Sequence, residues 1–333
     1  MSDTAPAHPG SSPPAPVQSL APEVQAAQAQ AREAGVGTPN VLTTPIAAVR
    51  EQARAYQKWL TEPAPPVARV VEHRLDHLPM PAVLRLYYPE GVTAPAEGLP
   101  LYLHLHGGGF ASGDLDTLDR WKREIAAQAG IVTAGLSYAL SPEARYPTAL
   151  DQVVGAVRWL HEHAGTLGLD ASRLALGGES AGGNLTLAAL VRLRDAGQPL
   201  IRTAAVIYGM LSARRDTHAQ RELGDGRFGL STDKLDWFWR QYVSDEAQLR
   251  DPGVAPLYAD IDDLPPLALL AAELDPLLDD TLDLAERLED GGATPWVKVY
   301  PGVTHSFIGM TRILPQAREA RDDLVAHLRR HLA

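Results

Sequence analysis

The chain of 333 residues contains no cysteine. This absence excludes disulfide bridges, thiolate nucleophiles, zinc–thiolate sites and iron–sulfur clusters. It is compatible with the reducing cytoplasm, which is the location that we expect. Any catalytic nucleophile must therefore come from another residue type.

Long apolar runs and an excess of basic charge are also missing. No stretch reaches the roughly 18 apolar residues of a membrane-spanning helix, and the first twenty residues lack the pattern of a signal peptide. Lys and Arg number 30 against 41 Asp and Glu, which gives a formal net charge of −11. Nucleic acids and anionic membranes attract basic proteins, so we expect neither as a partner. A monomer and a homodimer both stay open.

The remaining composition is that of a globular enzyme, with 45% hydrophobic and 21% charged residues. Residues 1–20 are rich in Pro, Ala and Ser and are predicted to be a disordered tail. In residues 21–62, apolar side chains recur at helical spacing on both sides of a Gly- and Pro-containing break at 35–39. This pattern predicts two N-terminal helices.

From residue 63 onward, strand patterns alternate with helical patterns. Strands are predicted at 68–76, 82–88, 101–106, 131–138, 173–178, 203–209, 266–273 and 295–300, and helices at 117–129, 147–163, 181–195, 279–290 and 316–332. Such alternation builds an α/β fold with a mostly parallel central sheet and helices on both faces. Residues 211–255 interrupt the rhythm and are predicted to be an insertion, so the core comprises 63–210 and 256–333.

The sharpest motif is Gly178-Glu179-Ser180-Ala181-Gly182, which lies between a predicted strand and a predicted helix. A nucleophilic serine on a tight strand-to-helix turn needs small neighbours, because larger side chains would collide with adjacent elements. The helix that follows directs its free N–H groups and its dipole at developing negative charge. A plain glycine-rich turn is the alternative for this pentapeptide.

A second motif, His106-Gly107-Gly108-Gly109-Phe110, directly follows a predicted strand. Glycines let backbone N–H groups approach a substrate oxygen, as an oxyanion hole requires. A phosphate-binding loop is the competing interpretation, since 108–113 matches G-x-x-x-x-G. Asp114 stands where that loop needs lysine, so the phosphate interpretation fails.

Two further candidates follow predicted strands near the end of the chain: Asp275 and His305. Parallel sheets gather functional side chains at the carboxyl ends of their strands. The order Ser180, Asp275, His305 is that of a nucleophile, acid and base in α/β-hydrolases. The nearby acids Glu273, Asp279 and Asp280 leave helix capping as an alternative role for this acidic cluster. His104 and His106 share a strand face, but no third ligand accompanies them, so we predict no metal site.

Together, these four motifs resemble the hormone-sensitive-lipase-like (bacterial type IV) esterase branch of the α/β-hydrolase superfamily, from about residue 40 to the end. The resemblance implies a sheet of about eight strands with a helical cap formed by 21–62 and 211–255. It also implies that the oxyanion donors are the N–H groups of Gly108, Gly109 and Ala181. No cofactor is implied.

The sequence departs from this family at several positions. Ser137 and Ala139 stand where the family usually has Asp and Arg, which support the oxyanion loop and its packing. Glu179 replaces the commoner Asp before the nucleophile, and Ser306 replaces a usual Gly after the base. These changes concern local stability and pocket shape rather than the reaction class.

We therefore predict a serine carboxylesterase that hydrolyses short- to medium-chain acyl esters through an acyl-enzyme. Phe110, Tyr138 and Trp237 are the candidate substrate-binding residues; the aromatic run 237–239 either lines a pocket or forms the buried face of a cap helix. The alternatives are an amidase of the aryl formamidase type, a deacetylase of an acetylated metabolite, and a non-catalytic small-molecule binding protein on the same fold.

Overall fold

The computed structural model describes residues 19–333. The predicted tail, residues 1–20, lies outside the described residues except for its last two positions. Within the described part of the chain, no helix combines the length and apolar character needed to cross a membrane.

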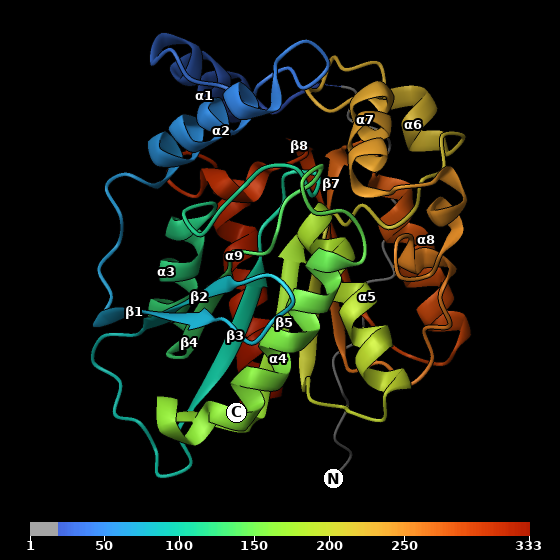
Figure 1. The fold of residues 1–333 in the computed structure, drawn as a ribbon. Helices are drawn as coiled ribbons and strands as arrows, with labels where there is room; N and C mark the ends of the chain where they lie inside the picture. Colours follow the sequence, from blue (N-terminus) through green and yellow to red (C-terminus); the bar gives the residue numbers. More distant parts are fainter. Residues whose placement is uncertain (1–18) are drawn as a thin grey trace, which may run out of the picture.

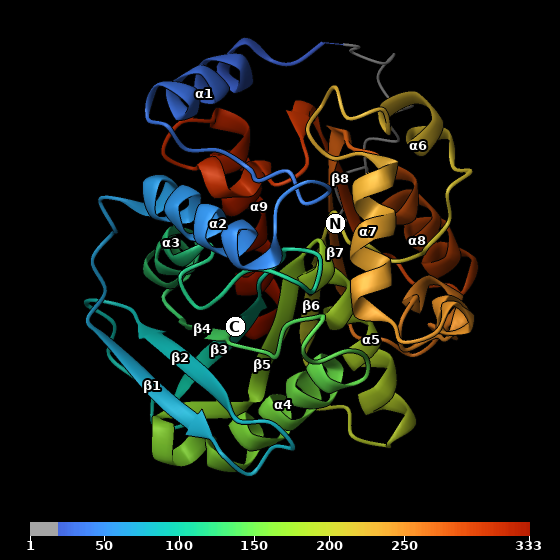
Figure 2. The ribbon, with the colours of Figure 1, turned by 45° about the horizontal axis from the view of Figure 1, so that its top comes forward.

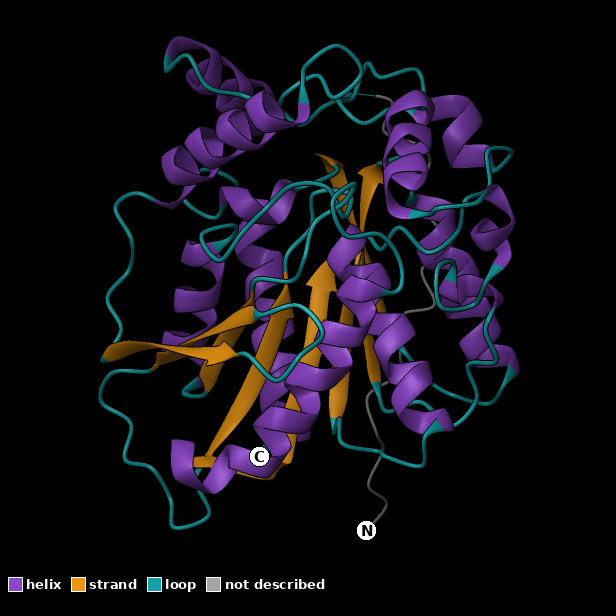
Figure 3. Ribbon diagram, in the orientation of Figure 1, coloured by secondary structure: helices purple, strands orange, loops and turns teal. Residues whose placement is uncertain are grey.

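An eight-stranded sheet forms the centre of the molecule, and its strand order is β1-β2-β4-β3-β5-β6-β7-β8 (Figures 1 and 3). The strands are β1 (Arg69–Leu75), β2 (Ala82–Tyr88), β3 (Leu99–Leu105), β4 (Val132–Leu136), β5 (Leu169–Glu179), β6 (Thr203–Ile207), β7 (Leu267–Leu274) and β8 (Trp296–Thr304). β2 runs antiparallel to both of its neighbours, whereas β4, β3, β5, β6, β7 and β8 pair in parallel. The predicted fold class is confirmed.

Helices cover both faces of the sheet because its central strands bury side chains on both sides. In β3, Leu101 and Leu103 belong to one buried cluster and Tyr102 to the other. The first face packs against α4 (Thr148–Leu167), α5 (Ala181–Asp195) and α8 (Leu278–Asp290). The second face packs against α3 (Asp119–Ala129) and α9 (Pro315–Leu332).

Two groups of helices lie beyond the carboxyl ends of the parallel strands (Figures 1 and 2). One group is α1 (Pro22–Glu33) and α2 (Ile46–Thr61), and the other is α6 (His218–Leu223) and α7 (Thr232–Tyr242). The structure also contains short 3-10 helices, at Glu246–Arg250, Pro256–Tyr258 and Phe307–Met310. The N-terminal segment and the insertion are thus placed at the same end of the sheet, far apart in sequence.

Several elements extend beyond their predicted limits. β5 begins at Leu169 rather than at residue 173, because Leu169 still pairs with Leu99 of β3, before a register shift after which Leu174 pairs with Leu101. α4 continues to Leu167 and stops at Gly168, which adopts a left-handed conformation with φ 71°. Backbone pairing and glycine stops, rather than hydrophobic periodicity, set these boundaries.

Candidate active site

Ser180 occupies the sharp turn between β5 and α5. Its backbone has φ 56° and ψ −118°, a conformation that a residue with a side chain rarely adopts. A Cβ atom on Gly182 would lie 2.0 Å from the carbonyl oxygen of Leu105, so glycine is required for the helix to begin this close to β3. The turn presents the Ser180 side chain at the carboxyl edge of the sheet.

Asp275 and His305 follow β7 and β8 and meet Ser180 at that edge. The Ser180 Oγ lies 2.9 Å from His305 Nε2, and His305 Nδ1 lies 2.7 Å from Asp275 Oδ2. An imidazole that carries its proton on Nδ1 satisfies both contacts, donating to the carboxylate and accepting from the hydroxyl. Asp275 is fully buried and Ser180 is 8% exposed. The structure therefore brings together the three residues named from the sequence.

The neighbouring acids hold other parts of the chain. Asp279 accepts a hydrogen bond from the N–H of Ala219, and Asp280 accepts from the N–H groups of Leu211 and Ser212. Helix α8 has no side-chain cap, so these carboxylates do not cap the helix that they open, which was the alternative role left open by the sequence. They anchor the segment after β6 and the start of α6 instead.

Three backbone N–H groups are expected to form the oxyanion hole. Among residues 19–333, the N–H groups of Gly108, Gly109 and Ala181 donate no hydrogen bond to the protein. Gly109 has φ 59°, and a Cβ atom there would lie 2.0 Å from the ring of Phe238 on α7. Only a glycine accommodates both that backbone conformation and that ring.

A buried polar network lies under the oxyanion loop. One carboxylate oxygen of Glu179 accepts the N–H of Gly107 at 2.5 Å, and the other lies 2.7 Å from His104 Nε2. Tyr102 completes the chain at 2.9 Å from His104 Nδ1. Glu179 stands where the family usually has Asp. Its longer side chain reaches both the oxyanion loop and the neighbouring strand β3.

His104 and His106 serve packing and support in this structure. Both ring nitrogens of His104 are occupied by Glu179 and Tyr102. The ring of His106 stacks on Tyr138 at 4.2 Å between centroids, and burial lowers the pKa of His106, which favours its neutral form. Within the described residues, no group of three or more metal-ligating side chains converges.

Two of the three predicted substrate-binding residues need correction. Phe110 is fully buried and stacks on Tyr242 of α7, with ring centroids 3.7 Å apart. Tyr138 is 3% exposed, and its hydroxyl donates to the carbonyl oxygen of His106 at 2.6 Å. Neither side chain offers a surface to a substrate, because loop packing already surrounds both. Through these contacts, both side chains help to hold the oxyanion loop in place.

The aromatic residues at 237–239 on α7 do not all have the same role. Trp239 is buried against Phe110 and Tyr242. Phe238 lies against Gly109, at the oxyanion loop. Trp237 is half-buried and meets the edge of Phe238, with ring centroids 5.3 Å apart. The sequence pattern did not identify Phe238 as a candidate substrate-binding residue, because helical spacing does not show which of the three rings faces the oxyanion loop.

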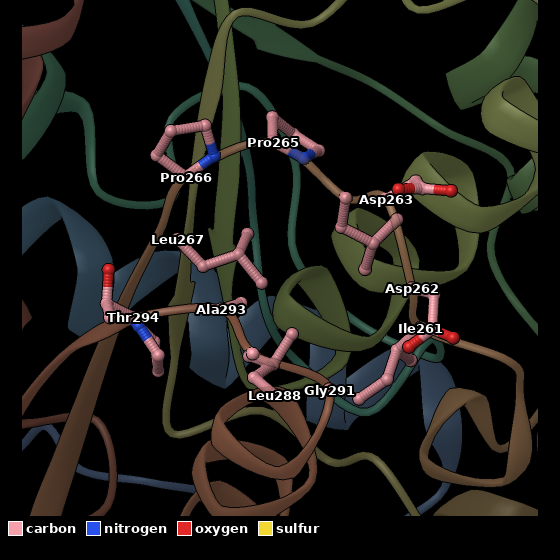
Figure 4. A pocket seen from close by; sticks show the side chains of 13 residues that line it. Ile261, Asp262, Asp263, Pro265, Pro266, Leu267, Leu288, Gly291, Ala293 and Thr294 are labelled. Carbon is pink, nitrogen blue, oxygen red and sulfur yellow. The ribbon is translucent and has the colours of Figure 1, made fainter.

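A surface hollow lies at the opposite end of the sheet, where β7 and β8 begin (Figure 4). Residues 261–267 and 291–295 line it, and its two carboxylates, Asp262 and Asp263, are exposed. No side chain of the Ser180 site contributes to this hollow. This hollow is therefore separate from the Ser180 site.

A comparison with known families finds that the alpha/beta hydrolase fold family matches residues 102–309. The chain belongs to this family. The family resemblance stated from the sequence is thereby confirmed, and the matched span includes Ser180, Asp275 and His305.

Similar proteins carry esterase names. The chain is 37% identical over 253 residues to the ethyl acetate hydrolase of Pseudomonas putida, covering 75% of this chain and 78% of that protein. It is 34% identical over 242 residues to the acetyl esterase of Salmonella paratyphi B, covering 72% and 73%. These alpha/beta hydrolases support hydrolysis of carboxylic esters as the reaction class.

Solved structures agree with the sequence relatives. The hyperthermophilic esterase of the archaeon Pyrobaculum calidifontis has a TM-score of 0.86 and 29% identity, covering 94% of this chain and 99% of that one. An ester hydrolase from the metagenome of Lake Arreo, complexed with a bipyridine phosphonate derivative, has a TM-score of 0.86 and 32% identity over the same shares. The likeness extends well beyond the part that the family match covers.

Proposed function

We propose that this alpha/beta hydrolase is a serine carboxylesterase for acetyl and other short- to medium-chain acyl esters. The observation that carries the proposal is the hydrogen-bonded series Ser180–His305–Asp275, beside N–H groups on Gly108 and Gly109 that donate to no acceptor among residues 19–333. A nucleophile, a base, an orienting acid and oxyanion donors are the complete requirement for acyl transfer without a cofactor.

In the proposed mechanism, neutral His305 removes the proton of Ser180 while the Ser180 oxygen attacks the ester carbonyl. The N–H groups of Gly108, Gly109 and Ala181 stabilise the resulting oxyanion. The tetrahedral intermediate collapses, His305 protonates the leaving alcohol, and an acyl-enzyme remains. Water, deprotonated by His305, then attacks the acyl-enzyme and releases the acid. Asp275 holds the imidazole in the required tautomer throughout.

Two observations support a small acyl group. The ring of Phe238 lies directly against Gly109 and so occupies space next to the carbonyl position. The similar proteins from Pseudomonas putida and Salmonella paratyphi B are named for ethyl acetate and acetyl esters. A ring beside the oxyanion loop favours acyl groups that are small enough to fit next to it.

The test is hydrolysis of p-nitrophenyl esters from acetate to palmitate by the wild type, Ser180→Ala and Ser244→Ala. Ser244 is exposed, and it takes no part in the hydrogen bonds that join Ser180, His305 and Asp275, so its variant is the matched control. We expect highest kcat/KM on short chains, loss of activity in Ser180→Ala and unchanged activity in Ser244→Ala. Equal activity in wild type and Ser180→Ala would contradict the proposal.

A fluorophosphonate probe separates an enzyme from a binding protein on the same fold. It should add its mass to the wild type and to Ser244→Ala, but not to Ser180→Ala. p-Nitroanilides and aryl formamides, assayed in parallel, test the amidase alternative. Higher kcat/KM on amides than on the matching esters would replace the esterase assignment. A cytoplasmic location, compatible with the cysteine-free sequence, is tested by fractionation of the producing cell.

A further inference from the structure

Arg50, on the N-terminal helix α2, reaches two loops of the catalytic core. Its Nε donates to the carbonyl oxygen of Ala111 at 2.9 Å, and its Nη2 donates to the carbonyl oxygen of Ser141 at 3.0 Å. Both terminal nitrogens also bind the carboxylate of Glu143, at 2.8 and 2.6 Å. The Arg50 side chain is only 19% exposed. One guanidinium thus joins the N-terminal cap to the loops at 108–112 and 141–143.

The Ala111 carbonyl is coupled to the oxyanion glycines by a tight turn. The N–H groups of Ala111 and Ser112 both donate to the carbonyl oxygen of Gly108, at 3.1 and 3.0 Å. The N–H of Ser141 donates to the carbonyl oxygen of Phe110 at 2.8 Å. A displacement of Ala111 therefore changes the direction of the peptide groups at Gly108 and Gly109.

Arginine suits this position because its planar fork offers five donors in a fixed arrangement. Ala111 is fully buried, so its carbonyl oxygen would lose its charged partner if Arg50 were removed, and water would have to replace it.

We propose that Arg50 is a positioning residue, which holds the N–H groups of Gly108 and Gly109 in the direction of the oxyanion. The inference rests on the proposed esterase function. It gives Arg50 of α2, which lies outside the matched family region, a role in fixing the oxyanion loop. The substrate itself is not touched by Arg50.

Arg54, one turn further along α2, provides a matched control. It forms an ion pair with Asp114 at 3.0 Å, just beyond the same loop, but its side chain is 62% exposed. Exposed ion pairs contribute little to stability or geometry. A general loss of positive charge or of helix packing would affect both arginines, whereas the proposed role belongs to Arg50 alone.

The experiment measures kcat and KM for p-nitrophenyl acetate, and the Ki of a trifluoromethyl ketone, in the wild type, Arg50→Gln, Arg50→Lys and Arg54→Gln. The ketone adds to the nucleophile and presents an oxyanion to the Gly108–Gly109 loop. We expect kcat to fall about 10- to 100-fold in Arg50→Gln, with KM changed less than threefold. Ki should rise by the same factor as kcat falls, and Arg54→Gln should stay within twofold of wild type.

Arg50→Lys keeps the charge and the stem but lacks the fork, so its kcat should lie between those of the wild type and Arg50→Gln. Arg50→Lys provides the test of the proposed positioning role if Arg50→Gln does not fold. A kcat within twofold of wild type in folded Arg50→Gln would overturn the inference, as would an effect confined to KM. If Arg50→Gln does not fold, a kcat within twofold of wild type in Arg50→Lys would overturn it. An inactive wild type would instead contradict the proposed function, so the two failures are distinguishable.

Discussion

The ring of Phe110, next to the oxyanion glycines, lies parallel to the ring of Tyr242 at the end of α7, with 3.7 Å between centroids and 6° between planes. Both side chains are fully buried. The stack connects the insertion to the oxyanion loop, opposite the contact that Arg50 makes from α2. The hydroxyl of Tyr242 has no hydrogen-bond partner within residues 19–333.

This arrangement predicts different outcomes for two changes at Tyr242. Tyr242→Phe keeps the ring and removes an unpartnered hydroxyl, so the free energy of unfolding should change by less than about 1 kcal/mol and kcat should be retained. Tyr242→Ala removes the ring from Phe110 and should cost about 3–5 kcal/mol. Urea denaturation measures both. Equal destabilisation by the two variants would show that the hydroxyl, and not the stack, matters.

Asp275 is expected to be the orienting acid, and Asp279 supplies its control. Asp275→Asn should lower kcat by about 10²–10⁴ with little change in KM, because the amide favours the wrong imidazole tautomer. Asp279→Asn should stay within about threefold of wild type, since the hydrogen bond that Asp279 accepts comes from the start of α6 and not from the Ser180 site. The measurement is steady-state hydrolysis of p-nitrophenyl acetate. The assignment fails if the Asp279 variant is the more impaired of the two.

Phe238 is expected to limit acyl chain length. Because its ring lies against Gly109, Phe238→Ala should raise kcat/KM for p-nitrophenyl octanoate relative to acetate by about tenfold. Trp237→Ala is the comparison, since Trp237 touches the edge of Phe238 and was the residue selected from the sequence. If the octanoate-to-acetate ratio of kcat/KM changed only in the Trp237 variant, Trp237 rather than Phe238 would be the residue that limits acyl chain length.

Glu179 is expected to hold the oxyanion loop through the N–H of Gly107. Glu179→Ala leaves that N–H and the His104 ring without their buried partner, each at a cost of about 1–3 kcal/mol. Glu179→Gln retains an acceptor for Gly107 and should lose less stability and less kcat. Thermal unfolding and ester hydrolysis test this order. Identical behaviour of the two variants would contradict the expected role of the Gly107 contact.

His327 on α9 predicts a loss of stability in mild acid. Burial, with smaller effects of His331 and Arg330, lowers the pKa of His327 from 6.5 to about 4. Between pH 6.5 and 4 the unfolded chain therefore binds a proton that the folded chain does not, so the free energy of unfolding falls as the pH falls. The full effect is on the order of 3 kcal/mol, from about 1.4 kcal/mol per pKa unit.

The measurement is urea denaturation between pH 4 and 7.5 for the wild type and His327→Gln. The glutamine amide can replace the contact between His327 Nε2 and the Thr203 hydroxyl, which are 2.7 Å apart, without titrating. The variant should show a shallower decline of stability below pH 6.5. His218→Gln, at an exposed position, should follow the wild-type curve. Parallel curves for wild type and His327→Gln would contradict the prediction.

The sequence by itself determined the sheet, its helices and the identity of the central chemical groups. Strand and helix patterns are local, and the residues around Ser180 and in the 106–110 loop must be small for local steric reasons. Asp275 and His305 could be named because they directly follow strands whose carboxyl ends meet at one edge. These features depend on short stretches of chain, so a single sequence reveals them.

The tertiary structure decided which side chains support that chemistry. Arg50 lies 61 residues before Ala111, and Phe238 lies far beyond Gly109; no local pattern shows that either pair meets. Phe110 and Tyr138 looked like pocket residues because they are aromatic and close to the motifs in sequence, yet both are buried. Long-range packing decides whether such a side chain lines a pocket or is buried in the core, and the hydrophobic pattern of the sequence does not show which of the two occurs.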